Sequence, residues 1–315
     1  MASPGAPVLS LRGLGKSFAG HLSLTKKSVV EGITLDVLPG EIFGFLGQNG
    51  AGKTTTIKMI VGLIFPTRGS VEIMGQPAAR AGARGRLGYL PENPYFYDYL
   101  TAEEFLRYYG HLYGIPRDEL ARRIPAVLAR VGLAGKEALP LRKYSKGMVQ
   151  RVGIAQAILN DPAVVVLDEP MSGLDPIGRR DVRDIMLELR ARGTTVFFSS
   201  HILQDAEMIC DRVGILVQGR LVTVGPLSDL LTRKADTFEV QVERVGPDVF
   251  ASLGTRVERL SERNGAQLLR VATEADLREV LSRTLAAGGR VERVAPRRET
   301  LEELFLRASD DGRAG

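Results

Sequence analysis

The chain is poor in the residues and segments that define several classes of protein. Its 315 residues include no tryptophan, three histidines and one cysteine, Cys210. A single cysteine excludes an internal disulfide and is typical of a reducing compartment. No apolar run approaches the roughly 20 residues that a membrane-spanning helix needs, so any membrane role is expected to be peripheral. Residues 1–7 carry neither a basic nor an apolar region, so we expect no secretory signal.

What the chain does contain is typical of a globular protein with a full core. Hydrophobic residues make up 44% of it and charged residues 25%. Its length suits one large domain or two ordinary ones. The net charge of +5 is compatible with nucleic acid or an anionic membrane surface as a partner. Much of the arginine is scattered among glutamates, as in residues 290–298, which favours a solvated surface over a nucleic-acid groove.

Strand-like and helical segments alternate along the first 225 residues. Apolar periodicity predicts a helix at 54–63, a mostly helical insert at 91–161 and a helix at 179–192. A capping-box pattern, Thr101 to Glu104, marks the start of the first helix of the insert. The alternation predicts an α/β domain with a largely parallel sheet. The expected strands are 8–18, 33–37, 41–46, 69–74, 86–90, 163–167, 194–199 and 213–217, with a polar, basic insertion near 21–28.

A different pattern follows after about residue 225. Strand and helix signals there follow the order βαββαβ, which predicts a small ferredoxin-like α+β domain. This part holds no cluster of catalytic residue types. Its expected strands are 237–245, 256–260, 267–271 and 290–295, with a turn at Asn264-Gly265 and helices at 247–253, 274–287 and 300–306.

A glycine-rich loop joins the strand at 41–46 to the helix that follows. It matches GxxxxGK[ST], a loop whose backbone N–H groups point at the β- and γ-phosphates of a nucleotide. Lys53 supplies a charge to those phosphates, the Thr54 hydroxyl is a candidate Mg²⁺ ligand, and Thr55 can add a hydrogen bond. The flanking strand and helix make a chance match improbable. The loop residues are Gly47, Gln48, Asn49, Gly50, Ala51, Gly52, Lys53 and Thr54.

Two acids end the apolar strand at 163–167. Asp168 is placed to hold Mg²⁺, directly or through water. Glu169 comes one residue later, where a carboxylate can orient and deprotonate an attacking water. An Asp-Glu pair after a strand is often only a surface turn, but the preceding phosphate-binding loop favours the catalytic interpretation.

A second turn with phosphate-binding character lies in the helical insert. Tyr144, Ser145, Lys146, Gly147 and Met148 open a helix with a Ser-x-Gly turn. Such a turn presents a hydroxyl and free backbone N–H groups. It is well separated in sequence from the first loop.

In this order, the motifs resemble the nucleotide-binding domain of an ABC transporter over residues 8–225. The resemblance makes 47–54 the Walker A motif, 164–168 the Walker B motif and 144–148 the signature, commonly LSGGQ. It makes Asp175 part of the D-loop, His201 the switch histidine and Phe18 the aromatic that stacks on adenine. It implies a P-loop NTPase fold, ATP and Mg²⁺ as cofactors, and catalysis by Glu169 with His201.

The resemblance also implies a partner, because two such domains pair head to tail in that family. Each ATP then lies between the Walker A motif of one copy and the signature of the other. Ser145 and Gly147, the expected phosphate contacts, are present, whereas Lys146 and Met148 replace the usual glycine and glutamine. Glu92 stands at the usual Q-loop glutamine and is expected near the metal; the alternative is that Asn93 contributes instead.

The signature form and the end at 299–306 resemble the ATPases of type-2 bacterial exporters, which are related to ABCA-type domains. Their permeases are separate chains. An aromatic run, Tyr95, Phe96, Tyr97 and Tyr99, suits either a groove for a membrane partner's helix or satellite core under the insert.

We therefore expect a cytoplasmic ATPase subunit that works as a homodimer and drives export through a permease on the inner face of the membrane. Its expected domains are 1–230, with a helical subdomain at about 92–161, and 236–315. A non-transport ABC ATPase acting on nucleic acid or ribosomes is the alternative, disfavoured because the chain has one Walker A motif and no long heptad segment. A regulatory module with little catalysis ranks lower, since Glu169 and His201 are present.

Overall fold

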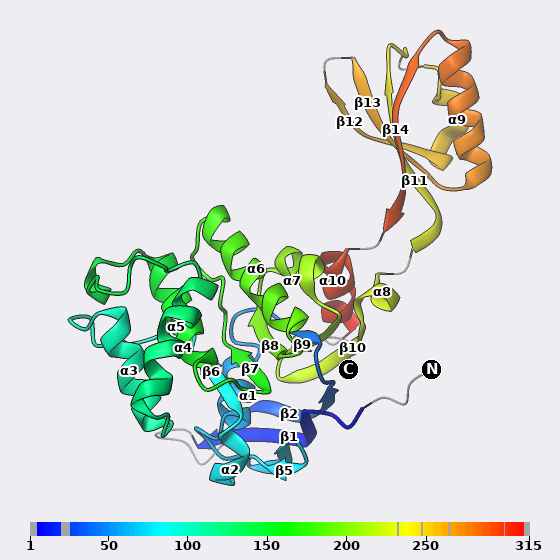
Figure 1. The fold of residues 1–315 in the computed structure, drawn as a ribbon. Coiled ribbons are helices and arrows are strands. Elements are labelled where there is room, and N and C mark those ends of the chain that lie inside the picture. Colours follow the sequence, from blue (N-terminus) through cyan, green and yellow to red (C-terminus); the bar gives the residue numbers. More distant parts are fainter. Residues whose placement is uncertain are drawn as a thin grey trace. The chain divides into compact units, whose positions relative to one another are not determined.

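The structure is a computed structural model that describes residues 5–19, 26–231, 233–246, 248–263, 265–298 and 300–311. The chain divides into two compact units (Figure 1). The first comprises Met1–Leu227 together with Phe305–Gly315, and the second comprises Ser228–Leu304.

A six-stranded sheet forms the centre of the first unit, in the order β10-β9-β3-β8-β7-β6. Its strand pairs are parallel except for the antiparallel hairpin of β9 and β10. Three of the parallel strands, β3, β7 and β8, are buried along their whole length, which explains the continuous apolar sequence of β7 and the largely apolar sequence of β3. The strands are β3 (Ile42–Leu46), β6 (Leu87–Leu90), β7 (Val164–Leu167), β8 (Thr195–Ser200), β9 (Arg212–Val217) and β10 (Arg220–Pro226).

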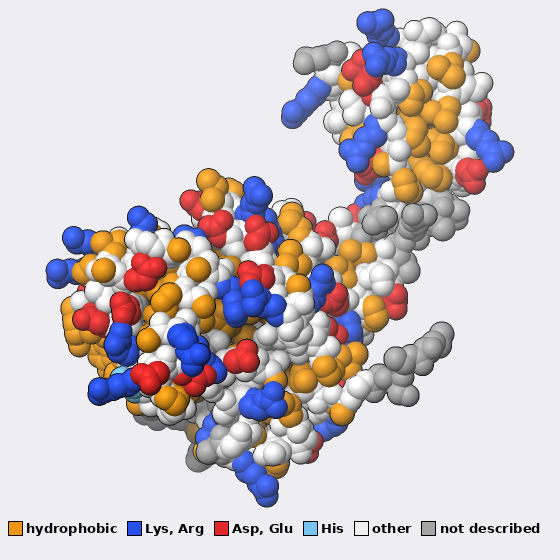
Figure 2. Space-filling model, viewed as in Figure 1, with side chains coloured by type: hydrophobic (Ala, Val, Ile, Leu, Met, Phe, Trp, Pro, Cys, Tyr) orange, Lys and Arg blue, Asp and Glu red, His pale blue; other side chains and the backbone are white. Residues whose placement is uncertain are grey.

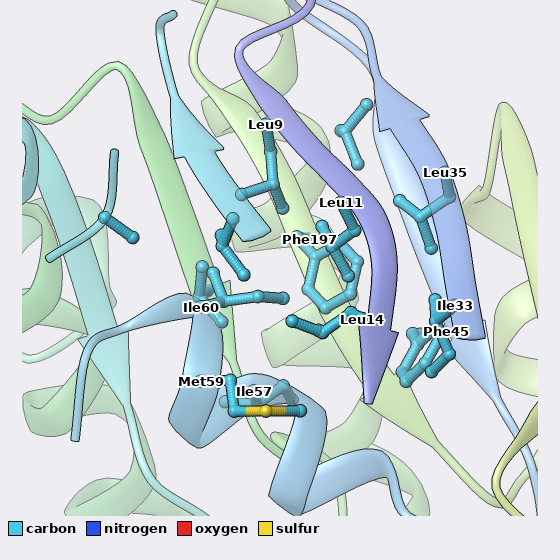
Figure 3. Close-up of a cluster of buried hydrophobic side chains, with 14 of the residues drawn as sticks. Leu9, Leu11, Leu14, Ile33, Leu35, Phe45, Ile57, Met59, Ile60 and Phe197 are labelled. Atoms are coloured by element: carbon cyan, nitrogen blue, oxygen red, sulfur yellow. The ribbon is translucent and has the colours of Figure 1, made fainter. Parts of the chain in front are cut away.

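A second, antiparallel sheet has the order β2-β1-β4-β5. The two sheets and helix α1 (Lys53–Ile60) enclose the main apolar core, in which leucines of β1 face α1 and the rings of Phe45 and Phe197 (Figure 3). The Phe43 and Phe197 rings stack with centroids 5.6 Å apart. Burial of each large apolar side chain contributes about 1.5–3 kcal/mol. The strands are β1 (Leu9–Ala19), β2 (Lys26–Val37), β4 (Arg68–Ile73) and β5 (Gln76–Pro77).

Strand β2 begins earlier than the sequence pattern indicated. Residues 26–28 were expected in a polar insertion, yet they pair with the end of β1, where Ala19 opposes Lys26. An antiparallel partner can hold exposed polar residues in a strand that their own propensity does not favour. The rest of the expected insertion, 21–25, lies outside the described residues.

The helical insert lies between β6 and β7. Its first helix carries the expected capping box: the Glu104 N–H donates to Thr101 Oγ1, and the Thr101 N–H donates to Glu104 Oε2 at 2.8 Å. This prediction is confirmed. The helices of the insert are α3 (Ala102–Leu112), α4 (Arg117–Arg130), the 3₁₀ turn η1 (Leu141–Lys143) and α5 (Lys146–Ile158). The other helices described in the first unit are α2 (Ala81–Arg84), α6 (Pro176–Ala191) and α7 (Leu203–Ile209).

The second unit holds a four-stranded antiparallel sheet in the order β12-β13-β11-β14, the order of a ferredoxin-like fold. Its own small core includes Val240, Val242, Leu269 and Val280. The expected first helix is only a 3₁₀ turn. After α8 (Leu227–Leu230) the elements are β11 (Arg233–Glu243), η2 (Ala251–Arg256), β12 (Val257–Arg263), β13 (Ala266–Val271), α9 (Glu274–Ala286) and β14 (Arg290–Arg298).

The end of the chain differs from the expected division into domains. We expected the last helix inside a domain at 236–315, whereas the segment from Phe305 onward belongs to the first unit. The helix is α10 (Leu301–Asp311). Its Phe305 ring is buried beside residues 48–51 and 216–218, and that packing explains the assignment. Pro247, Asn264 and Glu299, which the sequence analysis also used, lie outside the described residues.

Candidate active site

The glycine-rich loop connects β3 to α1, at the carboxyl end of the parallel sheet. Gly50 and Gly52 have positive φ values of 80° and 105°, which favour glycine. Space also demands glycine: a Cβ on Gly47 would lie 2.5 Å from the Leu216 carbonyl oxygen, and one on Gly52 would lie 2.8 Å from that of Val29. No side chain caps α1, so its first N–H groups remain available to an anion.

Lys53 lies inside the loop with only 5% of its side chain exposed. Its Nζ donates to the carbonyl oxygens of Gly47 at 2.7 Å and Gln48 at 3.1 Å, so the loop curls around the ammonium. The same nitrogen forms a buried ion pair with Glu169 Oε1 at 3.0 Å. These partners hold the charge at the mouth of the loop, where a phosphate would approach.

Asp168 ends β7 and points at the start of α1. The Thr54 hydroxyl donates to Asp168 Oδ1 at 3.3 Å, and the Ser199 hydroxyl donates to the same oxygen at 2.7 Å. Burial raises the pKa of the Asp168 carboxyl, and these two hydrogen bonds oppose that shift. Its Oδ2 is buried and accepts no hydrogen bond from the described residues.

These donors fit a magnesium ion. A carboxylate and a hydroxyl oxygen are hard ligands of the kind that Mg²⁺ prefers, and the unpartnered Asp168 Oδ2 is available as one such ligand. The described residues contain no group of three or more His, Cys, Asp and Glu side chains that would form a complete protein cage. Mg²⁺ usually keeps several waters and takes phosphate oxygens as further ligands, so a partial protein set is sufficient.

Glu169 is held between Lys53 and His201 in a constrained backbone conformation. Its φ is +49°, a left-handed value that is uncommon for a residue with a side chain and that is often found at functional sites. Its N–H donates to Ser199 Oγ at 2.8 Å. Oε2 lies 2.8 Å from His201 Nδ1, while Oε1 faces Lys53. Lysine, glutamate and histidine thus form one connected chain of contacts.

A pocket of about 320 Å³ lies over this network. Both Lys53 and Glu169 line it, and so do Thr54, Thr55 and Glu92. Glu92 is exposed on the pocket wall, and its negative charge contributes to the raised pKa of Asp168. Asn93, the alternative residue, is not among the lining residues. Phe18 also lies outside the lining, 43% exposed, with the Lys16 ammonium 5.1 Å from its ring centroid.

A second pocket, of about 360 Å³, lies at the start of α5 and contains none of the residues of the first. Ser145 caps α5 by accepting a hydrogen bond from the Met148 N–H at 3.3 Å. Ser145, Lys146 and Gly147 line the pocket on one side, and the turn that includes Asp175 lines the other.

Two of the expected nucleotide-binding residues, Asp175 and Tyr144, form hydrogen bonds within the chain near the second pocket. Asp175 caps α6, since its Oδ1 accepts from the Gly178 N–H at 2.7 Å. Tyr144 is buried among the helices of the insert, and its hydroxyl donates to the Lys136 carbonyl at 2.8 Å. Tyr144 is therefore positioned to fix the start of the turn, while Asp175 also lines the second pocket.

Ser199 is a site residue that the sequence analysis did not single out. Its hydroxyl donates to Asp168 and accepts from the Glu169 N–H, so it ties the two acids together. The available signal was a serine pair at the end of the buried β8 strand, where apolar residues are usual. Such a buried hydroxyl requires a polar partner.

Comparisons with known proteins agree with this geometry. The family described as ABC transporter matches residues 30–172. An ABC transporter ATP-binding protein of Nostoc sp. is 43% identical over 88% of this chain and 82% of its own length. Nod factor export ATP-binding protein I of Ralstonia nicotianae is 34% identical, with 82% and 78% covered. ATP-binding cassette sub-family A member 7 of Mus musculus is 35% identical over 96% of this chain and 14% of its own.

Solved structures show the same fold. The ATP-binding subunit of an ABC transporter has a TM-score of 0.62 and 37% identity, and the match covers 71% of this chain and 91% of that one. The cbiO1 protein of Clostridium perfringens, part of the ABC transporter complex cbiONQ, has a TM-score of 0.63 and 25% identity, with 71% and 90% covered. This chain therefore belongs to the ATP-binding proteins of ABC transporters, in the group similar to sub-family A and bacterial exporter ATPases, and it is an ATPase.

Proposed function

We propose that the chain drives export: two copies close on two ATP molecules with Mg²⁺, and their hydrolysis moves a separate membrane permease. The observation that carries the catalytic part is the position of Glu169, buried between Lys53 and His201 at the edge of the phosphate-binding loop. Export as the direction rests on the similarity to the Nod factor export protein and to the exporter subgroup.

The loop provides the binding part of the reaction. The free N–H groups at the start of α1 and the Lys53 ammonium face the β- and γ-phosphates. Lys53 then exchanges part of its present contacts for phosphate oxygens. Thr54 and Asp168 would hold Mg²⁺, which supplies charge neutralisation to the phosphates when bound.

Glu169 and its neighbours provide the catalytic part. The Glu169 carboxylate accepts a proton from the water that attacks the γ-phosphorus, as the β–γ bridging bond breaks. His201, 35% exposed at the edge of the site, orients the carboxylate through its Nδ1 contact, and its other ring nitrogen would serve the γ-phosphate. Ser199 ties the Glu169 backbone to the Asp168 carboxylate, because it accepts from the Glu169 N–H and donates to Asp168 Oδ1.

The second pocket supports the dimer. Ser145 and Gly147 offer a hydroxyl and helix N–H groups to an anion, but they line a pocket other than the one that holds Lys53. A head-to-tail pair places the signature turn of one copy over the loop of the other. ATP then holds the interface together, and hydrolysis releases it.

The tyrosines of the helical insert support a permease as partner. Tyr95 is 96% exposed, and Tyr97 and Tyr99 are also largely exposed, which suits an interface with apolar bodies and polar tips. Phe96 packs instead against Phe105, with ring centroids 4.4 Å apart, so this residue belongs to the core of the helical insert and the proposal concerns the tyrosines alone. We propose that the exposed tyrosines receive a cytoplasmic helix of the permease.

Membrane attachment in this proposal runs through that permease. None of the helices in the described part of the chain has the length and apolar character needed to cross a bilayer. Figure 2 shows Lys and Arg interspersed with Asp and Glu over the face of the larger unit in view, without a single-sign groove there. That mixed surface supports a protein partner over nucleic acid.

Glu169→Gln tests the catalytic assignment. The amide keeps the shape of the side chain but accepts no proton, so we expect turnover to fall by roughly 10²–10⁴-fold. ATP binding, measured by calorimetry, is expected to remain, and ATP is expected to trap the dimer in size-exclusion chromatography. Turnover equal to wild type would refute the base assignment, and a monomer at saturating ATP would refute the paired arrangement. Co-purification with a chain of several apolar spans tests the permease.

A further inference from the structure

The last helix of the chain places an aromatic ring beside the phosphate-binding loop. Phe305, on α10, is 7% exposed and belongs to the first unit. It lines a cavity of about 140 Å³ together with residues 48–51 of the loop and residues 216–218 at the end of β9. Figure 1 shows α10 in red near β9 and β10. Residues more than 250 positions apart in sequence thus enclose one small space at the outer side of the loop.

The turn between β9 and β10 already braces the loop from this side. The Gly219 N–H donates to the Ala51 carbonyl at 2.9 Å, and the Gly219 carbonyl accepts from the Glu31 N–H at 2.8 Å. A Cβ on Gly219 would lie 2.5 Å from the Val29 carbonyl oxygen, so the turn fits closely against β2. The turn therefore has a fixed position, and Ala51 is tied to it.

The segment between Gly47 and Ala51 has little side-chain packing of its own. A Cβ added at Gly50 would meet nothing within 4 Å, and Gln48 and Asn49 line the cavity instead of filling a core. Open space next to a glycine-rich backbone allows that backbone to shift. The Phe305 ring occupies part of this space and limits the shift.

We propose that Phe305 is a positioning residue for the phosphate-binding loop: its ring, together with the β9–β10 turn, holds residues 48–51 in the conformation that binds the phosphates. Removal of the ring enlarges the existing cavity, and the loop can then relax into it. Since the loop N–H groups must converge on the phosphates, a small displacement weakens nucleotide binding. Phe305 does not touch the nucleotide in this arrangement, and Glu169 keeps its partners.

Phe305→Ala tests this role, with Leu306→Ala as the matched control. Leu306 is the next residue of the same helix and is 58% exposed, so its truncation changes helix composition equally without changing the cavity. We expect Phe305→Ala to raise the KM for ATP about threefold to tenfold, a range typical of residues that act through packed neighbours. We expect kcat to change less than KM, and Phe305→Leu to restore most of the affinity.

Amide hydrogen exchange gives a second readout that a merely stabilising role would not change selectively. We expect faster exchange in a peptide covering 47–52 of Phe305→Ala, with unchanged exchange in one covering 164–167. An unchanged KM with unchanged loop exchange overturns the proposal. So does a lower melting temperature at an unchanged KM, because Phe305 would then only stabilise the unit. If Phe305→Ala does not fold, Phe305→Val decides: an elevated KM at a wild-type melting temperature supports the proposal, and a wild-type KM overturns it.

Discussion

The two phosphate-directed turns of this chain differ in how far the chain itself completes them. In the Walker A loop, Lys53 is buried. Its ammonium donates hydrogen bonds to two backbone carbonyls and forms an ion pair with Glu169. In the signature turn, Ser145 and Lys146 are exposed, and no ion pair of Lys146 occurs within the described part of the chain. The backbone of the first turn therefore surrounds the Lys53 ammonium, which the chain itself supplies. The second is stable as a helix start but presents its polar groups to something outside the chain.

The glycines of the two turns show the same difference. Gly47 and Gly52 are required by the chain's own backbone, because a Cβ at either position would lie within 3 Å of a carbonyl oxygen. At Gly147 a Cβ would meet nothing within 4 Å. The fold therefore explains glycine in the first turn and leaves it unexplained in the second. A bound nucleotide presented by a second copy would explain it.

The largest effect is expected from Lys53→Met, which disrupts the completed turn from within. It leaves the Glu169 carboxylate buried without its cation, and the loss of one partner of a buried ion pair typically costs about 3–5 kcal/mol. We expect a lower free energy of unfolding in urea and loss of ATP binding in calorimetry. Lys58→Met, on the exposed side of α1, is the matched control and is expected to change neither.

A double variant sharpens this test. Lys53→Met with Glu169→Gln removes both charges, so most of the lost stability is expected to return while ATP binding stays absent. If the free energy of unfolding of Lys53→Met equals that of wild type, the buried ion pair does not contribute to stability. The contrast between the two turns is then weaker than the structure indicates.

The same contrast explains what the sequence could and could not predict. The Walker A loop was predictable because its strand, glycines and helix are consecutive, and each needs only local chemistry. Asp168 and Glu169 were predictable for the same reason. The role of Ser199 was not, because its bonds to both acids depend on the neighbouring positions of β7 and β8.

Tertiary packing decided the remaining differences. The sequence pattern predicts that Phe305 belongs to a terminal helix of a separate domain. Only its burial next to residues 48–51 shows its connection with the loop. The sequence motif predicts that Tyr144 helps to bind the nucleotide, but its hydroxyl donates a hydrogen bond to a backbone carbonyl inside the helical insert. In both cases the contact partner lies on another segment of the chain, so local sequence could not identify it.

Gly147→Ala is expected to have the next largest effect and tests the incomplete turn. Within the chain the methyl group meets open space, and alanine favours helix over glycine by up to about 1 kcal/mol, so the melting temperature should hold or rise. Between two copies the methyl group would crowd the phosphate and weaken a charge-assisted hydrogen bond. Such a bond contributes about 1.5–3 kcal/mol, which corresponds to roughly 10- to 100-fold in ATPase rate.

A steady-state phosphate-release assay at saturating ATP measures this effect, and size-exclusion chromatography with ATP reports the dimer. Binding of ATP to the Walker A loop of the monomer should be unchanged, which separates Gly147→Ala from Lys53→Met. A fully active, fully dimeric Gly147→Ala variant would place the signature turn away from the phosphates and contradict the paired arrangement.

The smallest effect is expected from Lys146→Ala, which probes the charge that replaces the usual signature glycine. The Lys146 ammonium lies directly over Gly173, where an added Cβ would be 2.1 Å from its Nζ, so the side chain spans the second pocket toward the Asp175 turn. An exposed cation near a polyanion has a modest, salt-screened influence, so we expect ATPase activity at low salt to fall about two- to fivefold. The difference should disappear at high salt, and Lys143→Ala, which removes another exposed charge before the turn, should show no such dependence. A decrease that persists at high salt would instead mean that Lys146 positions the Gly173 turn by contact, and the two turns would then differ in packing as well as in charge.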